Sequence, residues 1–124
     1  MMMVKASEDY EAGRPPPPAL MARMAEYSAE MAKRGVLLET SGLAPSSMGA
    51  RIHLAGGTLT VMDGPFSETK ELVGGYAIIR AETREQAIEF GKDFMKVHVE
   101  VLGPGYSGAL EIRQLFDPND CMSR

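Results

Sequence analysis

Apolar and polar positions alternate along the chain in blocks that predict strands and helices in turn. The short apolar run 1–6 predicts an opening strand, and residues 36–40 predict another. Between them, residues 7–18 contain Gly13 and four consecutive prolines, which predicts a stiff loop. In the segment 20–34, apolar residues recur every three or four positions between charged residues, which predicts an amphipathic helix.

The middle of the chain has the pattern of a β-hairpin followed by a further strand. Residues 51–54 and 58–61 alternate between apolar and polar side chains and flank Gly56-Gly57, a pair that favours a tight hairpin turn. Residues 75–80 are mostly apolar and β-branched or aromatic, which predicts the next strand. The hairpin and the strand after it therefore place three expected strands in the middle of the chain.

A second helix and a final strand complete the pattern. Thr83 and Gln86 have the spacing of a capping box and predict a helix start, and the helical spacing continues to about His98. Residues 96–102 fit either a helix or a strand, because three valines alternate there. Residues 110–115 predict the last strand, and a polar, loosely packed tail is expected from about residue 117.

The order of these elements is βαββαβ with one inserted hairpin, which predicts a single α+β domain of ferredoxin-like architecture over residues 1–124. Helices in such an arrangement cover one sheet face only. The other face would stay uncovered in a monomer, so we expect a second copy to cover it and form a homodimer.

Composition narrows the classes of partner. The 124 residues are 44% apolar and carry a net charge of −4, without a cluster of basic residues, so direct nucleic-acid or membrane binding is not expected. One cysteine, Cys121, excludes an internal disulfide framework and, with no signal-like segment, favours a cytoplasmic location. The two histidines lack metal-site spacing and no nucleotide, flavin or haem motif is present, so neither metal nor cofactor is expected.

The segment 63–71, Asp-Gly-Pro-Phe-Ser-Glu-Thr-Lys-Glu, is the most distinctive in the chain. Asp63 before Gly64 can accept backbone hydrogen bonds in an Asx turn, and Pro65 fixes its own backbone angle, so a rigid corner is expected. Phe66 would then form an apolar wall. The charged residues Glu68, Lys70 and Glu71 would then lie at the edge of this apolar surface.

This segment resembles the signature of the YCII-related family, in its DGPF subgroup, and the similarity extends over nearly the whole chain. The resemblance implies a dimeric α+β barrel, and similar proteins are often encoded beside sigma factors of the extracytoplasmic-function type. Related proteins are thought to be enzymes in which a histidine early in the first helix meets an aspartate. The segment 20–34 contains no histidine, so this pair is not transferred.

Two functions of different classes are compatible with these residues. In the first, a cofactor-independent enzyme or small-molecule binder, Asp63 accepts a proton, Arg51 holds an anion and Tyr76 or His53 donates a hydrogen bond. Each residue also has a structural reading: Asp63 as a turn former, Lys70 as a surface ion pair and His53 as a solvent or dimer contact. Tyr27 and Tyr76 are further candidates for lining the cleft.

The second function is a non-catalytic accessory protein that binds another protein, such as a sigma factor, through its dimer surface or its proline loop. The gene neighbourhood implied by the family resemblance motivates this alternative. A ligand-sized cleft with converging polar groups would favour the first function over the second.

Overall fold

The computed structural model describes residues 1–68 and 71–116 and contains one antiparallel sheet of four strands. The strands lie in the order β2-β5-β1-β6, so the first strand of the chain is central. Their bounds are Met2–Lys5 for β1, Leu37–Gly42 for β2, Val73–Ile79 for β5 and Leu110–Ile112 for β6. β1 pairs with β5 on one side, where Met2 faces Ala77, and with β6 on the other, where Met2 faces Ile112.

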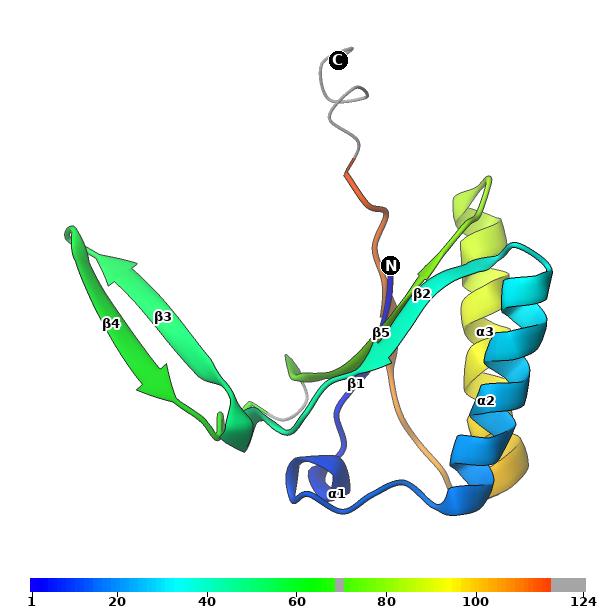
Figure 1. Cartoon of the computed structure of the whole chain (residues 1–124), viewed down its shortest axis with the longest axis horizontal. Helices are drawn as coiled ribbons and strands as arrows, with labels where there is room; N and C mark the ends of the chain where they lie inside the picture. The colour runs from blue at the N-terminus through cyan, green and yellow to red at the C-terminus, as the bar shows by residue number, and fades with distance from the viewer. Residues whose placement is uncertain (69–70, 117–124) are drawn as a thin grey trace, which may run out of the picture.

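Two long helices, α2 (Pro18–Lys33) and α3 (Arg84–Leu102), lie side by side on one face of this sheet (Figure 1). The core lies between these two layers. Its buried apolar side chains are Met2, Leu20, Met31, Ala77 and Val97. With β1-α2-β2-β5-α3-β6 as its frame, the chain has the predicted ferredoxin-like α+β fold. No helix in the described part of the chain is long and apolar enough to cross a membrane.

The helix ends follow the local sequence. Pro18 stands at the first position of α2, where its missing N–H costs no hydrogen bond, and Gly35 ends the helix with a positive φ of 73°. At the start of α3, the Thr83 side chain accepts a hydrogen bond from the backbone N–H of Gln86 at 3.0 Å. The Gln86 side chain accepts in turn from the N–H of Glu82 at 2.6 Å, so the predicted cap is confirmed, with its return bond one residue earlier.

Three local expectations need correction. The second helix continues past His98 to Leu102, and Val97 is buried while Val99 is 43% exposed, as helical rather than strand periodicity requires. The expected loop 7–18 contains a short helix, α1 (Glu8–Glu11), which Ser7 caps by accepting from the N–H of Tyr10. The final strand ends at Ile112 instead of residue 115. The expected tail lies outside the described residues.

The predicted hairpin is present and forms its own two-stranded sheet, which we call the arm. It comprises β3 (Ala50–Ala55) and β4 (Thr58–Asp63), joined by Gly56 and Gly57 with φ of 57° and 78°. Both values lie in the left-handed region that a tight hairpin turn of this kind requires. The arm extends away from the four-stranded sheet on the side opposite the helices (Figure 1).

Candidate functional site

The corner, residues 63–68, follows the last strand of the arm and turns the chain back toward the main sheet. The backbone N–H of Gly64 donates to the Gly49 carbonyl at 3.0 Å, and the Gly64–Pro65 peptide is cis. A Cβ atom on residue 64 would lie 1.7 Å from the carbonyl oxygen of Ser46. Only glycine fits this approach, so the expected rigid turn is present.

The expected Asx turn at Asp63 is not how the corner is held. Among the described residues, no hydrogen bond reaches the Asp63 carboxylate, which is exposed at the end of β4. Instead, the Ser46 hydroxyl accepts from the N–H of Phe66 at 3.1 Å and donates to the Glu11 carboxylate. Glu11 also accepts from the N–H of Ser46 at 3.1 Å. The short helix α1 therefore ties the 3-10 turn η1 (Ser46–Met48) to the corner.

Arg51, Phe66 and Glu68 meet at the corner, as the sequence suggested. The Arg51 guanidinium lies 3.9 Å from the centre of the Phe66 ring, within cation–π range, and its Nη1 is 3.5 Å from Glu68 Oε2. The pKa of Glu68 is lowered by a hydrogen bond from its own backbone N–H and by the charge of Arg51. The Arg51 side chain remains 41% exposed, so part of its donor fork is accessible to a ligand.

The remaining polar candidates are distributed around the arm. Arg51 and His53 alternate with Ile52 and so share one face, where His53 is opposite Thr60. Asp63 shares the other face with Val61, so strand alternation places it away from Arg51. Glu71 donates its backbone N–H to the Glu68 carbonyl at 2.9 Å and is exposed. Lys70 lies outside the described residues.

The two tyrosines suggested for the cleft lie on opposite faces of the main sheet. Tyr27 of α2 lines a small internal space together with Ala77 of β5. Tyr76 precedes Ala77 in the strand and points to the other face, where its hydroxyl is 3.0 Å from Glu39 Oε1. The bond to the carboxylate raises the pKa of Tyr76, because it stabilises the protonated phenol. Only Tyr76 can contribute to a cleft on the uncovered face.

Comparison with known proteins agrees with this architecture. Residues 1–98 match the YCII-related domain. The chain belongs to the YCII-related family. It is also 27% identical over 96 residues to "Uncharacterized protein R00369" of Rhizobium meliloti (strain 1021), a match that covers 77% of this chain and 73% of that protein.

A second cluster of this YCII-related protein joins α3 to the loop after it, and sequence reasoning had assigned it no role. The buried ring of His98 stacks on Tyr106 with centroids 5.5 Å apart and lies 5.1 Å from the ring of Phe94. His98 Nδ1 is 3.1 Å from the Phe94 carbonyl oxygen, so this nitrogen carries the proton and donates. The four-residue spacing of Phe94 and His98 was the available signal.

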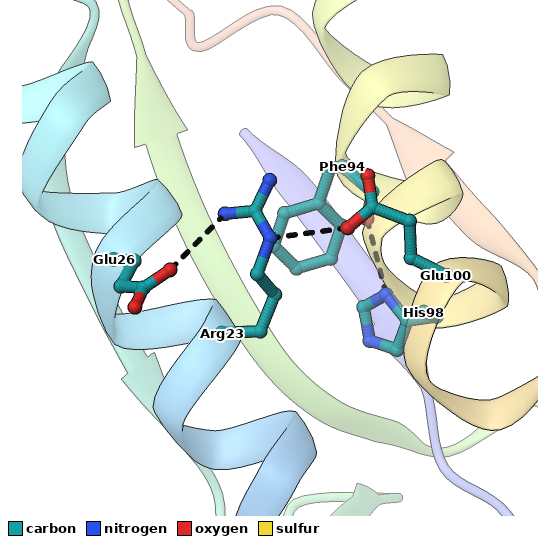
Figure 2. Close-up of polar contacts among 5 residues, drawn as sticks. All are labelled: Arg23, Glu26, Phe94, His98 and Glu100. Carbon is teal, nitrogen blue, oxygen red and sulfur yellow. Dashed lines mark hydrogen bonds and ion pairs between the residues drawn. The ribbon is translucent and has the colours of Figure 1, made fainter.

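An ion pair closes the outside of this cluster (Figure 2). Arg23 Nε of α2 donates to Glu100 Oε2 of α3 at 3.1 Å, and Arg23 Nη1 is 4.0 Å from Glu26 Oε2. Together with the aromatic contact between Tyr27 and Phe94, this pair connects the two helices. We assign the cluster a packing role, because the polar atoms of its buried members have partners.

Two hollows in the described part of the fold lie away from the corner. One, of about 20 Å³, lies between helices and sheet and has room for little more than a water molecule. The other is an open groove of about 680 Å³ between α3 and the edge strand β6. Neither is lined by a residue of the corner, and the side chains that meet there are open to solvent, because Arg51 is 41% and Glu68 54% exposed.

Proposed function

We propose that this protein is a homodimer of the DGPF subgroup that binds a small anionic molecule at the corner without a cofactor. The observation that carries this proposal is the position of Arg51, whose guanidinium is held over Phe66 at 3.9 Å and beside Glu68 at 3.5 Å. The binding site is then a surface element of a cytoplasmic protein rather than a deep pocket within one chain.

The physical basis is the preorganisation of the arginine. A guanidinium has five N–H donors in a planar fork that matches carboxylate and phosphate groups. Because stacking on an aromatic ring already restricts the arginine side chain, less conformational entropy is lost when a ligand binds. Glu68 neutralises the cation in the absence of ligand, and an exposed pair of this kind is weak enough for another anion to displace it. The ring of Phe66 offers an apolar contact to the body of the ligand.

The dimer in this proposal is formed through the sheet. We call the face of the main sheet that carries Met3, Tyr76 and Ile78 the open face, because no helix of the described residues covers it (Figure 1). These three side chains are half-buried already, and a second copy would bury them fully. Two such faces packed together would form the dimeric α+β barrel that the resemblance implies.

Binding can be tested with isothermal titration against a panel of small carboxylates and phosphate esters. Arg51→Gln should weaken the best ligand by about 10- to 100-fold, the range expected for a lost charge-assisted contact. Arg113→Gln is the matched control, because Arg113 is exposed and pairs with Glu111 of β6 rather than with a residue of the corner. Equal affinity of wild type and Arg51→Gln for every ligand would refute a site at the corner.

Catalysis requires a separate test, because binding alone does not establish a reaction. Asp63 is the candidate proton acceptor, and it is exposed where the corner begins. Asp63→Asn should preserve the fold and the ligand affinity but abolish any conversion of the bound ligand, followed by NMR. Unchanged conversion by Asp63→Asn would leave Asp63 without a catalytic role.

The alternative function is an accessory protein associated with an extracytoplasmic-function sigma factor. It is supported by the exposed apolar side chains of the arm, which a protein partner could cover. A pull-down of the purified protein with the extracytoplasmic-function sigma factors of the same organism tests it. Recovery at background level, together with ligand binding at Arg51, would leave the small-molecule function as the explanation.

A further inference from the structure

The open groove between α3 and the edge strand β6 has an apolar floor and a volume of about 680 Å³. Sites for small ligands usually measure roughly 300–1,000 Å³. The helix comes closest to the strand at Gly91, where a Cβ atom would lie 2.8 Å from Ile112 Cδ1 and 2.9 Å from Leu110 Cδ2. This approach holds the two strand side chains beneath the helix. The apolar side chains that line the groove are Ile88, Met95, Val99, Leu110 and Ile112.

The outer edge of β6 has backbone hydrogen-bonding groups that point away from the sheet. The Lys5 N–H donates to the Ala109 carbonyl at 3.0 Å, so the backbone of residue 109 faces β1. Because antiparallel strands bond through every second residue, Glu111 also faces β1, while the N–H and C=O groups of Leu110 and Ile112 point outward. In the described part of the chain, β1 is the only strand that pairs with β6. Such an edge is a template for an added strand.

The charged side chains of the described residues that line the groove are all basic. They are Arg84, Lys92 and Lys96, all on α3, although the whole chain carries a net charge of −4. Glu89 Oε1 lies 3.3 Å from Lys92 Nζ, but both side chains are exposed and such a pair is weak. The groove therefore favours an occupant that combines negative charge with apolar side chains.

We propose that an extended acidic segment of another protein binds in this groove by adding a strand to β6. Main-chain hydrogen bonds to Leu110 and Ile112 hold the segment, and every second side chain points toward α3. Lys92 and Lys96 are four residues apart, about 6 Å along the helix, and alternate residues of a strand are about 6.8 Å apart. Two acidic residues separated by one position therefore match the two lysines.

This site is separate from the corner and from the dimer contact of the proposed function. The groove lies on the helix side of the sheet and at its β6 edge, so the open face remains available to a second copy. A second copy that paired edge to edge through β6 would bring the lysines of two α3 helices together, and like charges disfavour that contact. A small amphiphilic anion would fill the apolar part of the groove but would leave the outward backbone groups without a protein partner. An acidic strand satisfies the charges and the backbone together.

Fluorescence polarisation with two labelled peptides tests the charge requirement. The first peptide, Ser-Val-Ser-Glu-Ser-Glu-Ser-Val, places two glutamates between two valines on one strand face, and the second has glutamine in place of both glutamates. The acidic peptide should bind at least about 10-fold more tightly at low salt, the gain expected from two exposed ion pairs, and the difference should shrink as salt is added. Equal affinity of the two peptides, or no binding by either, would overturn the proposal.

Charge reversal at Lys96 tests where the peptide binds. Lys96→Glu changes an exposed residue of the groove and should weaken binding of the acidic peptide about 10-fold or more. Lys33→Glu is the matched control, because Lys33 is exposed at the end of α2 and does not line the groove, and it should change the affinity less than about twofold. Arg51→Gln should also leave the peptide affinity unchanged. A loss of affinity in Arg51→Gln would place the peptide at the corner and overturn the proposal, whereas the small-anion site is tested by its own titration.

Amide hydrogen exchange followed by NMR tests whether the peptide adds as a strand. In saturating acidic peptide, exchange of the Leu110 and Ile112 N–H groups should slow at least about tenfold, whereas the Glu111 N–H, which already faces β1, should change little. Binding without new protection at Leu110 and Ile112 would show that the groove is filled without strand pairing, and the proposal would be wrong. Binding of decanoate that depends on Lys96, without binding of the peptide, would assign the groove to small amphiphilic anions instead. Protection of both N–H groups without peptide, in a protein that sediments as more than a dimer, would show that a second copy occupies the edge.

Discussion

Replacing Gly64 by alanine tests the closest backbone approach in the corner. The added Cβ would start 1.7 Å from the Ser46 carbonyl oxygen and must retreat beyond 3.0 Å, and its neighbour is backbone rather than a flexible side-chain end. That movement separates Gly64 N–H from Gly49 and Phe66 N–H from the Ser46 hydroxyl, each bond being worth about 1 kcal/mol. Together with about 1–3 kcal/mol of overpacking, the two lost bonds give an expected loss of at least roughly 3 kcal/mol.

The loss of stability should be confined to the corner and its surroundings, because the corner lies outside the two packed layers that hold the core. Hydrogen exchange measured by mass spectrometry on peptides covering 43–68 is therefore the most direct assay, and roughly 3 kcal/mol corresponds to about 100-fold faster exchange. Gly105→Ala is the control, because a Cβ there meets nothing within 4 Å. This substitution should change the exchange rates little. Protection that stays within about twofold of wild type in Gly64→Ala would refute the close approach.

Three further substitutions address charge and packing elsewhere. Hydrogen bonds from Lys5 and Arg113 lower the pKa of Glu111 in the folded protein. Its contribution to folding stability is therefore present above the unfolded pKa of about 4.3 and is lost as the pH falls through the lower folded value. Glu111→Gln should flatten the acid side of a plot of Tm against pH. Tyr76→Phe removes the bond to Glu39 and should leave the midpoint of urea unfolding nearly unchanged, whereas a clear decrease would place this pair in a buried interface. His98→Ala should cost about 2–3 kcal/mol, and a change under about 0.5 kcal/mol would contradict its burial.

Local sequence signals accounted for the frame of the fold because each acts over a few residues. The Gly56-Gly57 turn, the Gly35 helix end and the Thr83 cap all depend on backbone geometry that their own residue types dictate, and all three are present. The end of α3 was harder to place, since its alternating valines imitate a strand. There the packing of His98 against Tyr106 holds the helical continuation, and Tyr106 belongs to a different segment.

The contacts that build the corner could not be read from the sequence for the same reason. Glu11, Ser46 and Phe66 come from three segments without periodicity, and their hydrogen bonds span 35 and 20 residues. The motif indicated that a rigid turn would form at Gly64-Pro65 and that Phe66 would form an apolar wall beside it, but not that the Arg51 guanidinium would stack on that ring. It did not indicate that a serine in another loop, rather than Asp63, would hold the turn.

The absence of an Asp63 hydrogen bond in the described part of the chain changes how the motif is understood. A turn that is already fixed by Gly64, Ser46 and Glu11 does not need the aspartate to hold it. Asp63 is exposed at the end of β4, on the face of the arm that carries Val61. Strand alternation keeps this carboxylate on the opposite face of the arm from Arg51. An anion held by Arg51 would therefore not contact Asp63 of the same chain, so Asp63→Asn should leave its affinity unchanged in isothermal titration, and a clear loss of affinity would show that the two residues share one site.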